Sequence, residues 1–189
     1  MKLHVLTFLT LGLAMLVSGS GFGTTTTQPS NQDQQTVLGD KVNETINQFK
    51  TANPDIKFFF NNAYGYAVFP SVGSGAVVVG AAYGNGEVFE NGLLGADLTG
   101  YCSVTQGSVG AQIGGQVFSE IIFFENKEAY EQFTSGQFTF DARASAVAVN
   151  AGAAAAADYQ HGVAVFTMSQ AGLMVQAAIG GQSFSFTSK

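Results

Sequence analysis

The chain has 189 residues, of which 46% are hydrophobic and 11% are charged, and its formal net charge is −6. This length suits one domain with an N-terminal extension, and the 24 glycines with few charges favour a β-rich globular domain over a disordered chain. No Lys, Arg or His lies between Lys57 and Lys127. Nucleic-acid binding needs clustered cations against the phosphates, so this charge distribution excludes it.

The N-terminus has the layout of a secretory signal peptide, which we place at residues 1–20. A nearly uninterrupted apolar run at 5–17 follows Lys2 and precedes small residues, and it is too short to span a bilayer stably. We therefore expect export to the periplasm or the cell envelope. The segment Val17-Ser18-Gly19 would suit a bacterial lipoprotein, but Ser20 stands where the lipidated cysteine would be, so a lipid anchor is not predicted.

Residues 21–35 are rich in Thr, Gln, Ser and Asn and predict a flexible linker before a domain at 36–187. Cys102 is the only cysteine in the chain, which excludes an intrachain disulfide. Its apolar neighbours favour a small buried residue, with a reactive thiol as the alternative.

Two helices are predicted at the start of the domain. Residues 36–51 have apolar side chains at helical spacing, with polar residues between them. This stripe contains Leu38, Val42, Ile46 and Phe49. Asn53 and Pro54 then fit the cap and the first position of a second, short helix that ends near Gly65. The buried stripe of the second helix contains Ile56, Phe59, Phe60 and Ala63.

The apolar period changes to two after Gly65, which predicts strands separated by turns rich in Gly, Asn and Ser. The strands are expected at 66–69, 76–82, 87–89, 101–105, 110–118 and 120–124. Asn85-Gly86 and Asn91-Gly92 are typical hairpin dipeptides. Pro70 has no amide hydrogen to donate and therefore indicates a strand end or an edge.

A third helix is predicted to begin after Asn126 and to end at Ser135-Gly136, with Ala129 and Phe133 on one face. Residues 142–157 are ambiguous between helix and strand, and we favour a strand in their first half. The last strands are expected at 163–168, 173–179 and 182–187. Together these elements predict an α+β fold in which short helices flank a curved antiparallel sheet or a partly closed barrel.

Two internal repeats share glycines and apolar residues. Residues 113–119 return as residues 179–185 with one substitution. A second, looser repeat relates residues 65–84 to residues 162–181. Since the copies share no acids, bases or nucleophiles, they indicate a repeated way of pairing strands and favour binding over catalysis.

Several motifs resemble the SYLF domain family. Tyr64-Gly65-Tyr66-Ala67-Val68-Phe69-Pro70 is similar to the opening of that domain, and Val109-Gly110-Ala111-Gln112-Ile113-Gly114-Gly115-Gln116 is similar to its central motif. Glu125-Asn126-Lys127-Glu128-Ala129, residues 141–148 and Gly172-Leu173-Met174 follow in the family's order, so the resemblance covers residues 37–187. Eukaryotic members bind phosphoinositides and, in fungi, actin filaments, whereas bacterial members are exported envelope proteins described as lipid-binding. The resemblance therefore implies a membrane-lipid-binding module without enzymatic activity.

The chain departs from the family in the hairpin that follows Pro70. Members often carry a lysine there, whereas this chain has Ser71-Val72-Gly73-Ser74-Gly75, and the basic patch used for phosphoinositides has no counterpart. This departure favours apolar contact over recognition of an anionic headgroup.

The candidate lipid-binding residues are Lys41, Lys50, Lys57, Phe58 and Phe59. The helical period points Phe58 away from the core beside Lys57, where a ring would enter the acyl boundary while a cation meets a headgroup. Coverage of Phe58 by the linker or by a partner subunit is the alternative. We expect Lys41 and Lys50 to share a helical face, with Lys57 on the next helix, and a merely solvated face is the alternative for these lysines. The alanines within residues 142–157 would line an acyl groove or permit close packing of a helix.

The sequence predicts no enzyme, metal site or cofactor. His161 and Asp158 lack a nucleophile motif, and the Cys and His residues are too few for structural zinc. The positions considered for calcium, which lack the EF-hand pattern, are Asn85, Glu87, Glu90 and Asn91. We expect a non-enzymatic module of the bacterial cell envelope that contacts phospholipid or a membrane surface. The alternative is an envelope protein–protein interaction or structural module without lipid binding.

Overall fold

The structure is a computed structural model that describes residues 31–73, 81–107, 117–136, 138–139, 147–148, 157–169 and 181–189. Several of the predicted features lie outside these residues. They are the signal peptide at 1–20, the linker up to residue 30, the central SYLF-like motif at 109–116, most of the strands at 76–82 and 110–118, the Gly172-Leu173-Met174 motif, the strand at 173–179, and most of the alanine-rich segment at 142–157.

Three helices and one 3₁₀ turn are present in the described part of the chain, and each predicted helix is confirmed. The first helix begins earlier than predicted because Asn31 caps it, accepting a hydrogen bond of 2.8 Å from the Gln34 amide. The end of the expected linker, residues 32–35, is therefore helical. The bounds are α1 (Gln32–Ala52), η1 (Pro54–Ile56), α2 (Lys57–Asn62) and α3 (Lys127–Thr134).

The strands form one sheet in the order β5-β6-β4-β1-β2-β3-β7. Neighbouring strands are antiparallel, except that the short β5 runs parallel to β6. The bounds are β1 (Gly65–Val72), β2 (Ala81–Gly92), β3 (Gly95–Gly107), β4 (Phe118–Phe124), β5 (Val147–Ala148), β6 (Val163–Ser169) and β7 (Gln182–Ser188). The predicted α+β class is confirmed, and the sheet formed by the described residues is open, with β5 and β7 at its ends.

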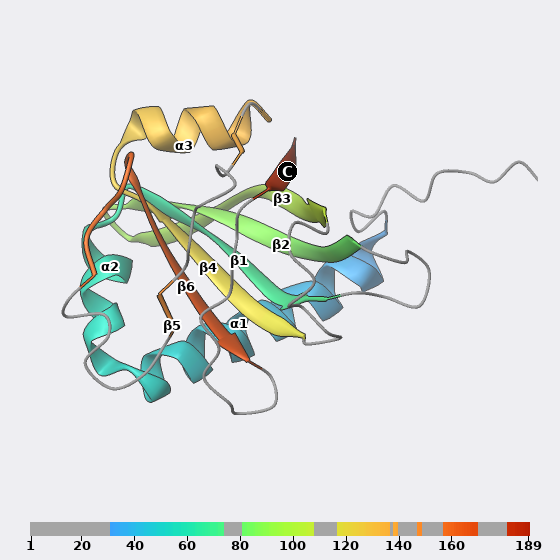
Figure 1. The fold of residues 1–189 in the computed structure, drawn as a ribbon, viewed down its shortest axis with the longest axis horizontal. Helices are drawn as coiled ribbons and strands as arrows, with labels where there is room; N and C mark the ends of the chain where they lie inside the picture. The colour runs from blue at the N-terminus through green and yellow to red at the C-terminus, as the bar shows by residue number, and fades with distance from the viewer. Residues whose placement is uncertain are drawn as a thin grey trace, which may run out of the picture.

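Helices cover both faces of the sheet (Figure 1). α3 lies on one face, where Tyr130 and Phe133 join the core formed by Ile122 and Phe124 of β4. α1 and α2 lie on the other face, over the alternate residues of the same strand, such as Phe123. The strict alternation of side chains along a strand therefore divides β4, all of whose residues are buried, between two cores.

The sheet is strongly curved toward the α3 face. Gln182 on β7 donates a hydrogen bond of 3.0 Å from its Nε2 to the Oε2 of Glu120 on β4. Three strands separate β7 from β4 in the sheet order, which in a flat sheet would keep these side chains about 19 Å apart at about 4.8 Å per strand. The curvature predicted from the sequence is therefore present, although the sheet does not close.

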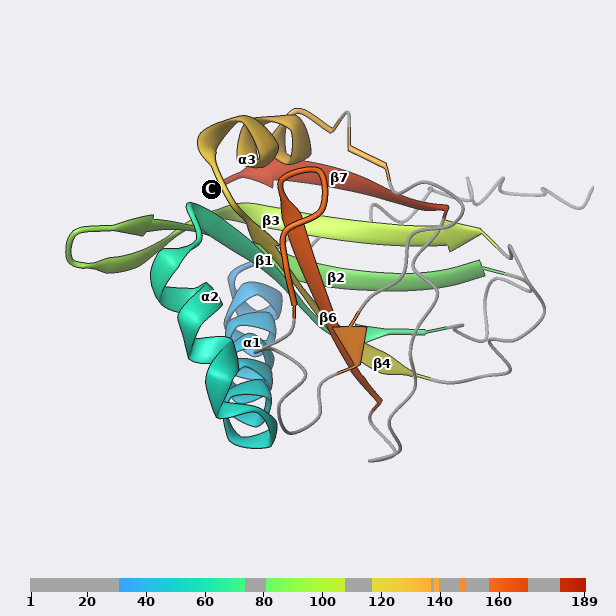
Figure 2. The ribbon, with the colours of Figure 1, turned by 60° about the vertical axis from the view of Figure 1, so that its left-hand side comes forward.

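The hairpin formed by β2 and β3 differs from its prediction. Asn85-Gly86 is not a turn, because both residues pair with β3 within one continuous strand. Gly86 is required there by close packing, since a Cβ at this position would lie 2.4 Å from the Val68 carbonyl oxygen. Asn91-Gly92 ends β2, and the turn itself consists of Leu93 and Leu94. The resulting hairpin extends well beyond the body of the described chain (Figure 2).

Pro70 and the looser repeat have clear places in the sheet. β1 is a central strand rather than an edge, but Pro70 falls at the irregularity between Phe69 and Val72 in its pairing with β4. The repeated segments at 65–69 and 162–166 give β1 and β6, which pair with opposite sides of β4. The prediction that the repeat encodes strand pairing is therefore confirmed for these two segments.

Candidate functional site

The first turn of α2 presents the aromatic residue that the helical period singled out. Asn53 begins the turn before α2 by accepting a hydrogen bond of 3.1 Å from the Asp55 amide, as its sequence context predicted. α2 then buries Phe59 and Phe60 against the sheet and leaves Phe58 on the outside. The Phe58 side chain is 61% exposed, and Lys57 beside it is exposed as well. An aromatic ring and a cation thus share one exposed turn.

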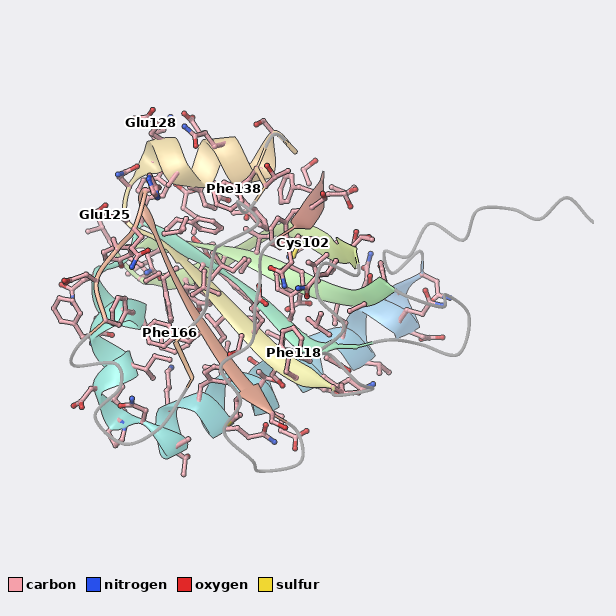
Figure 3. All side chains as sticks on the ribbon, viewed as in Figure 1. Cys102, Phe118, Glu125, Glu128, Phe138 and Phe166 are labelled. Carbon is pink, nitrogen blue, oxygen red and sulfur yellow. The ribbon has the colours of Figure 1, made fainter. Side chains whose placement is uncertain are left out.

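Phe59 belongs to the core. Only 2% of Phe59 is exposed, and its ring centroid lies 4.9 Å from that of Phe166 and 5.5 Å from that of Phe123. Phe166 is labelled in Figure 3, where it lies on the side of the sheet that faces α2. In the folded protein the Phe59 ring is therefore not available to a lipid, and its contribution is to fix the helix that carries Phe58.

Lys50 is half-buried and already has an aromatic partner. Its Nζ lies 4.3 Å from the centroid of the Phe60 ring, which is a cation–π geometry. Burial lowers the pKa of Lys50, and the nearby positive charge of Lys57 lowers it further. The structure therefore brings Lys50 and Lys57 together beside the Phe58 turn.

Lys41 does not join this pair, and the prediction that Lys41 and Lys50 share a helical face is wrong. α1 is a continuous α-helix through both residues. At about 100° per residue, an interval of nine residues places the two side chains half a turn apart. At about 1.5 Å per residue they are also separated by about 14 Å along the axis. Lys41 is an exposed lysine at a distance from the Phe58 turn.

Leu93 and Leu94 form an exposed apolar pair that sequence reasoning missed. Both side chains are fully exposed in the β2–β3 turn, at 106% and 105%. The pattern Gly92-Leu93-Leu94-Gly95 was a usable signal, because turns between strands are usually polar. The Asn91-Gly92 dipeptide placed the predicted turn too early, and Leu93 and Leu94 were left without a role between the strands expected at 87–89 and 101–105.

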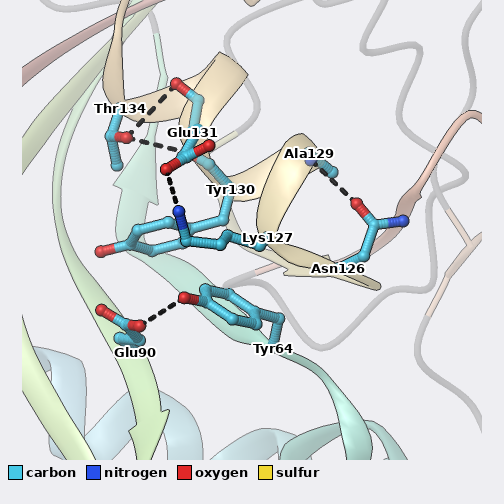
Figure 4. A network of polar contacts seen from close by, with 8 residues as sticks. All are labelled: Tyr64, Glu90, Asn126, Lys127, Ala129, Tyr130, Glu131 and Thr134. Atoms are coloured by element: carbon cyan, nitrogen blue, oxygen red, sulfur yellow. Dashed lines mark hydrogen bonds and ion pairs between the residues drawn. The ribbon is translucent and has the colours of Figure 1, made fainter.

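Figure 4 shows one polar contact at the base of this hairpin and several within the neighbouring helix α3. The hydroxyl of Tyr64, at the start of β1, donates a hydrogen bond of 2.6 Å to the carboxylate of Glu90 on β2. On the neighbouring helix, Asn126 caps α3 by accepting a hydrogen bond of 3.0 Å from the Ala129 amide. Lys127 of α3 forms an exposed ion pair with Glu131. The Tyr64 contact keeps the carboxylate of Glu90 engaged, and the other two contacts stabilise α3.

His161 and Cys102 lie in the settings expected for structural residues. His161 is exposed, with a φ of 53°, in the turn before β6, and Asp158 is exposed nearby in the chain. Cys102, labelled in Figure 3, is fully buried on β3. Burial raises the pKa of its thiol well above the ordinary value, which disfavours the reactive thiolate.

The positions considered for calcium do not converge. Asn85, Glu87 and Asn91 alternate with Glu90 along one strand, so Glu90 points to the opposite face of the sheet. Glu87 is buried beside α1, where its carboxylate would contact a Cβ at Gly39. Within the residues that the structure describes, no group of three or more acidic, His or Cys side chains is placed to hold a metal ion. In that same part of the chain, no helix is both long and apolar enough to cross a membrane.

Comparison with known proteins connects the chain with a family of binding domains. Residues 105–189 match the family model Ysc84, described as Las17-binding protein actin regulator. Beta cell expansion factor A from Aeromonas veronii is 29% identical over 131 residues, which cover 69% of this chain and 49% of that protein. The chain thus spans about half the length of this relative. The residues matched by the family model follow the candidate site, which lies in α1, α2 and the β2–β3 turn.

Proposed function

We propose that this chain, whose residues 105–189 match the Ysc84 (SYLF) family model, is a non-enzymatic module that binds membrane lipid in the bacterial cell envelope. Two observations support this location. Residues 1–20 have the layout of a signal peptide, and the similar protein from Aeromonas veronii is bacterial. Ser20 at the lipoprotein position makes the proposed product an unlipidated one, which must reach lipid through its folded surface.

The exposure of Phe58 is the observation that carries this proposal. The Phe58 ring touches the edge of the Phe59 ring, with 5.7 Å between the centroids, yet it remains 61% exposed. Phe59 and Phe60 bury the other face of this six-residue helix. The neighbours of Phe58 suit the interface of a bilayer, because Lys57 begins the same helix and Lys50, in the last turn of α1, is close to Lys57. An aromatic ring at the acyl boundary with lysines at headgroup level is how interfacial anchors are built.

The expected strength of this contact is modest. Full burial of a phenylalanine side chain contributes about 1.5–3 kcal/mol, and a lysine near an anionic surface contributes about 1 kcal/mol. Lys50 contributes less than this, because its ammonium is already placed over the Phe60 ring. The proposed attachment is therefore reversible and mainly apolar.

Replacement of Phe58 by serine tests the proposal. Phe58→Ser should weaken co-sedimentation of residues 21–189 with phospholipid vesicles about tenfold, because the lost ring accounts for at least about 1.4 kcal/mol. Val37→Ser is the matched control, since Val37 is 53% exposed on α1 and is not part of the Phe58 turn. Full vesicle binding by a folded Phe58→Ser protein would contradict the anchor.

A protein partner is the alternative function, and one observation favours it. Among the described strands β7 is the last in the sheet order, where it pairs with β3 and forms an isolated bridge from Ser183 to Thr139. An edge of this kind can add a strand from a partner. Absence of binding to both zwitterionic and anionic vesicles would move the proposal to this alternative.

A further inference from the structure

The β2–β3 hairpin carries its most apolar residues at the point farthest from the body of the protein. Leu93 and Leu94 are the two turn residues, and both are fully exposed. Figure 2 shows the turn projecting as a narrow finger beyond α2. An exposed leucine alone needs no explanation, but two adjacent ones at the tip of a projecting hairpin need one.

The turn is built to hold both leucines outward. Gly92 and Gly95 pair with each other across the hairpin, which closes the turn immediately behind the leucines. Gly95 has a φ of 129°, a conformation that residues with a side chain rarely adopt, and a Cβ there would meet no atom within 4 Å. Gly95 is therefore required for the shape of the backbone and not for packing. With this tight turn, few backbone N–H and C=O groups at the tip are unpaired. The free-energy cost of moving the tip out of water is therefore lower.

The hairpin is fastened to α2, the helix of the proposed anchor. The side-chain amide of Asn91 donates hydrogen bonds of 3.0 Å and 2.8 Å to the carbonyl oxygens of Phe60 and Ala63. The backbone N–H of Asn91 also donates a hydrogen bond of 2.9 Å to the Tyr64 carbonyl oxygen. The leucine tip and Phe58 thus belong to the same end of the molecule and are joined by a rigid connection.

The charges beneath the tip are negative. Glu90 and Asp97 are opposite each other in the hairpin, and neither β2 nor β3 contains a Lys, Arg or His residue. The tip therefore cannot recognise a phosphate or an acidic peptide. Its apolar end can enter the boundary between headgroups and acyl chains, and the carboxylates behind it would remain in water and limit the depth.

We propose that Leu93 and Leu94 form a membrane-inserting tip that enters a phospholipid bilayer beside Phe58. This inference rests on the proposed lipid-binding function and names a second point of contact for it. A bilayer fits the tip better than a protein does, because two leucine side chains fall far short of the roughly 800 Å² per partner of a stable protein interface. The same two side chains are enough to add to an existing apolar attachment.

The absence of tryptophan from the chain allows a local test of insertion. Leu94→Trp places the chain's only tryptophan at the tip, and Val37→Trp places it at an exposed apolar position on α1. Val37 is close to Gly39, which faces Glu87 on β2. Leu93 is six residues further along that hairpin. At 3.3 Å per residue, the two probe positions are therefore about 20 Å apart. The protein purified from expressing cells is mixed with phosphatidylcholine vesicles, with and without brominated acyl chains.

Insertion of the tip gives a blue-shifted emission for Leu94→Trp and quenching by the brominated chains, with neither effect for Val37→Trp. Replacing both leucines by serine should weaken vesicle co-sedimentation roughly tenfold, with Phe58 intact. Co-sedimentation with an unshifted, unquenched Leu94→Trp signal would overturn the inference and leave lipid binding through Phe58 standing. Failure of the unsubstituted protein to co-sediment would overturn both, and would favour a protein partner for the tip.

Discussion

Glu120 shows how a single buried side chain makes the fold sensitive to pH. It is fully buried on the α3 face of β4, and burial raises the pKa of its carboxyl group from 4.5 to about 7. The hydrogen bond from Gln182 opposes this shift but does not cancel it. Among the described residues, the other carboxyl oxygen, Oε1, has no hydrogen-bond partner, and neither do the Thr167 hydroxyl and Gln182 Oε1. A charge at this position is therefore poorly compensated.

The folded protein should lose stability as the pH rises from 5 to 8. The folded pKa of Glu120 lies above the unfolded value, so its contribution is fully present below about 4.5 and is lost as the pH rises through about 7. The change in the pKa of Glu120 from 4.5 to about 7 corresponds to a loss of at most about 3 kcal/mol in the free energy of unfolding. Glu120→Gln, which carries no charge at any pH, should flatten the dependence of the urea midpoint on pH.

Glu87 provides the matched comparison, because burial also raises the pKa of its carboxyl group to about 7, although Lys189 opposes the shift. Glu87→Gln should remove a separate part of the pH dependence, and the double variant should remove most of it. If Glu120→Gln and the unsubstituted protein show the same change in urea midpoint between pH 5 and pH 8, the ionised carboxylate is stabilised by something else.

The residues of the candidate site were predictable only where a local period decides orientation. Phe58 was found because its neighbours fix the buried face of a helix, which the sequence displays directly. Lys50 could be placed on α1, but its position over the Phe60 ring depends on how α1 meets α2, which no local pattern encodes. Leu93 and Leu94 were missed because a strong dipeptide signal lay just before them.

At the scale of elements, β2 explains why strand boundaries were the weakest predictions. Its glycines suggested turns, but Gly86 lies inside a continuous strand that faces Val68 and Phe69 of β1. The sequence does not distinguish a glycine needed for close packing between strands from a glycine needed for a turn. The two roles differ only in whether a neighbouring strand packs against the glycine. Helix limits were predicted better, since caps such as Asn53 and Asn126 act on their own next residues.

Gly86→Ala should destabilise the sheet without changing the surface. The added Cβ would lie 2.4 Å from the Val68 carbonyl oxygen and 2.8 Å from the Phe69 ring, so β1 and β2 must separate locally. Overpacking of this kind costs about 1–3 kcal/mol. Gly107→Ala is the control, because a Cβ at that end of β3 meets nothing within 4 Å. Urea denaturation of the two variants measures the difference, and equal midpoints would show that the strands adjust without cost.

At the scale of the whole molecule, the internal repeat predicted related roles but not their orientation. Ala67 of β1 is opposite Ile122 of β4, whereas its repeat partner Ala164 of β6 is opposite Phe123. The register is shifted by one residue, so equivalent alanines face opposite cores. Strand order and register depend on contacts between distant segments, and for that reason the sequence predicted a curved sheet but not its order.

The charge of the whole chain bears on the proposed membrane contact. A formal net charge of −6 repels an anionic bilayer, and Lys50 and Lys57 offset this only near the Phe58 turn. The apolar contact of Phe58 does not depend on salt, whereas charge interactions at the surface are screened beyond about 10 Å at 0.1 M salt. Attachment should therefore be at least as strong on zwitterionic vesicles as on anionic ones at low salt.

Vesicle co-sedimentation at low and high salt decides between the apolar and the charge-driven mode. Added salt should leave binding to zwitterionic vesicles unchanged and should not release the protein from anionic vesicles, because screening weakens the general repulsion as well as the lysine contacts. On zwitterionic vesicles, Lys57→Gln should change binding less than about twofold, whereas Phe58→Ser should change it about tenfold. Binding to anionic vesicles alone that disappears at high salt would instead assign the contact to Lys41, Lys50 and Lys57. The negative charge of the rest of the chain would then have to face away from the membrane.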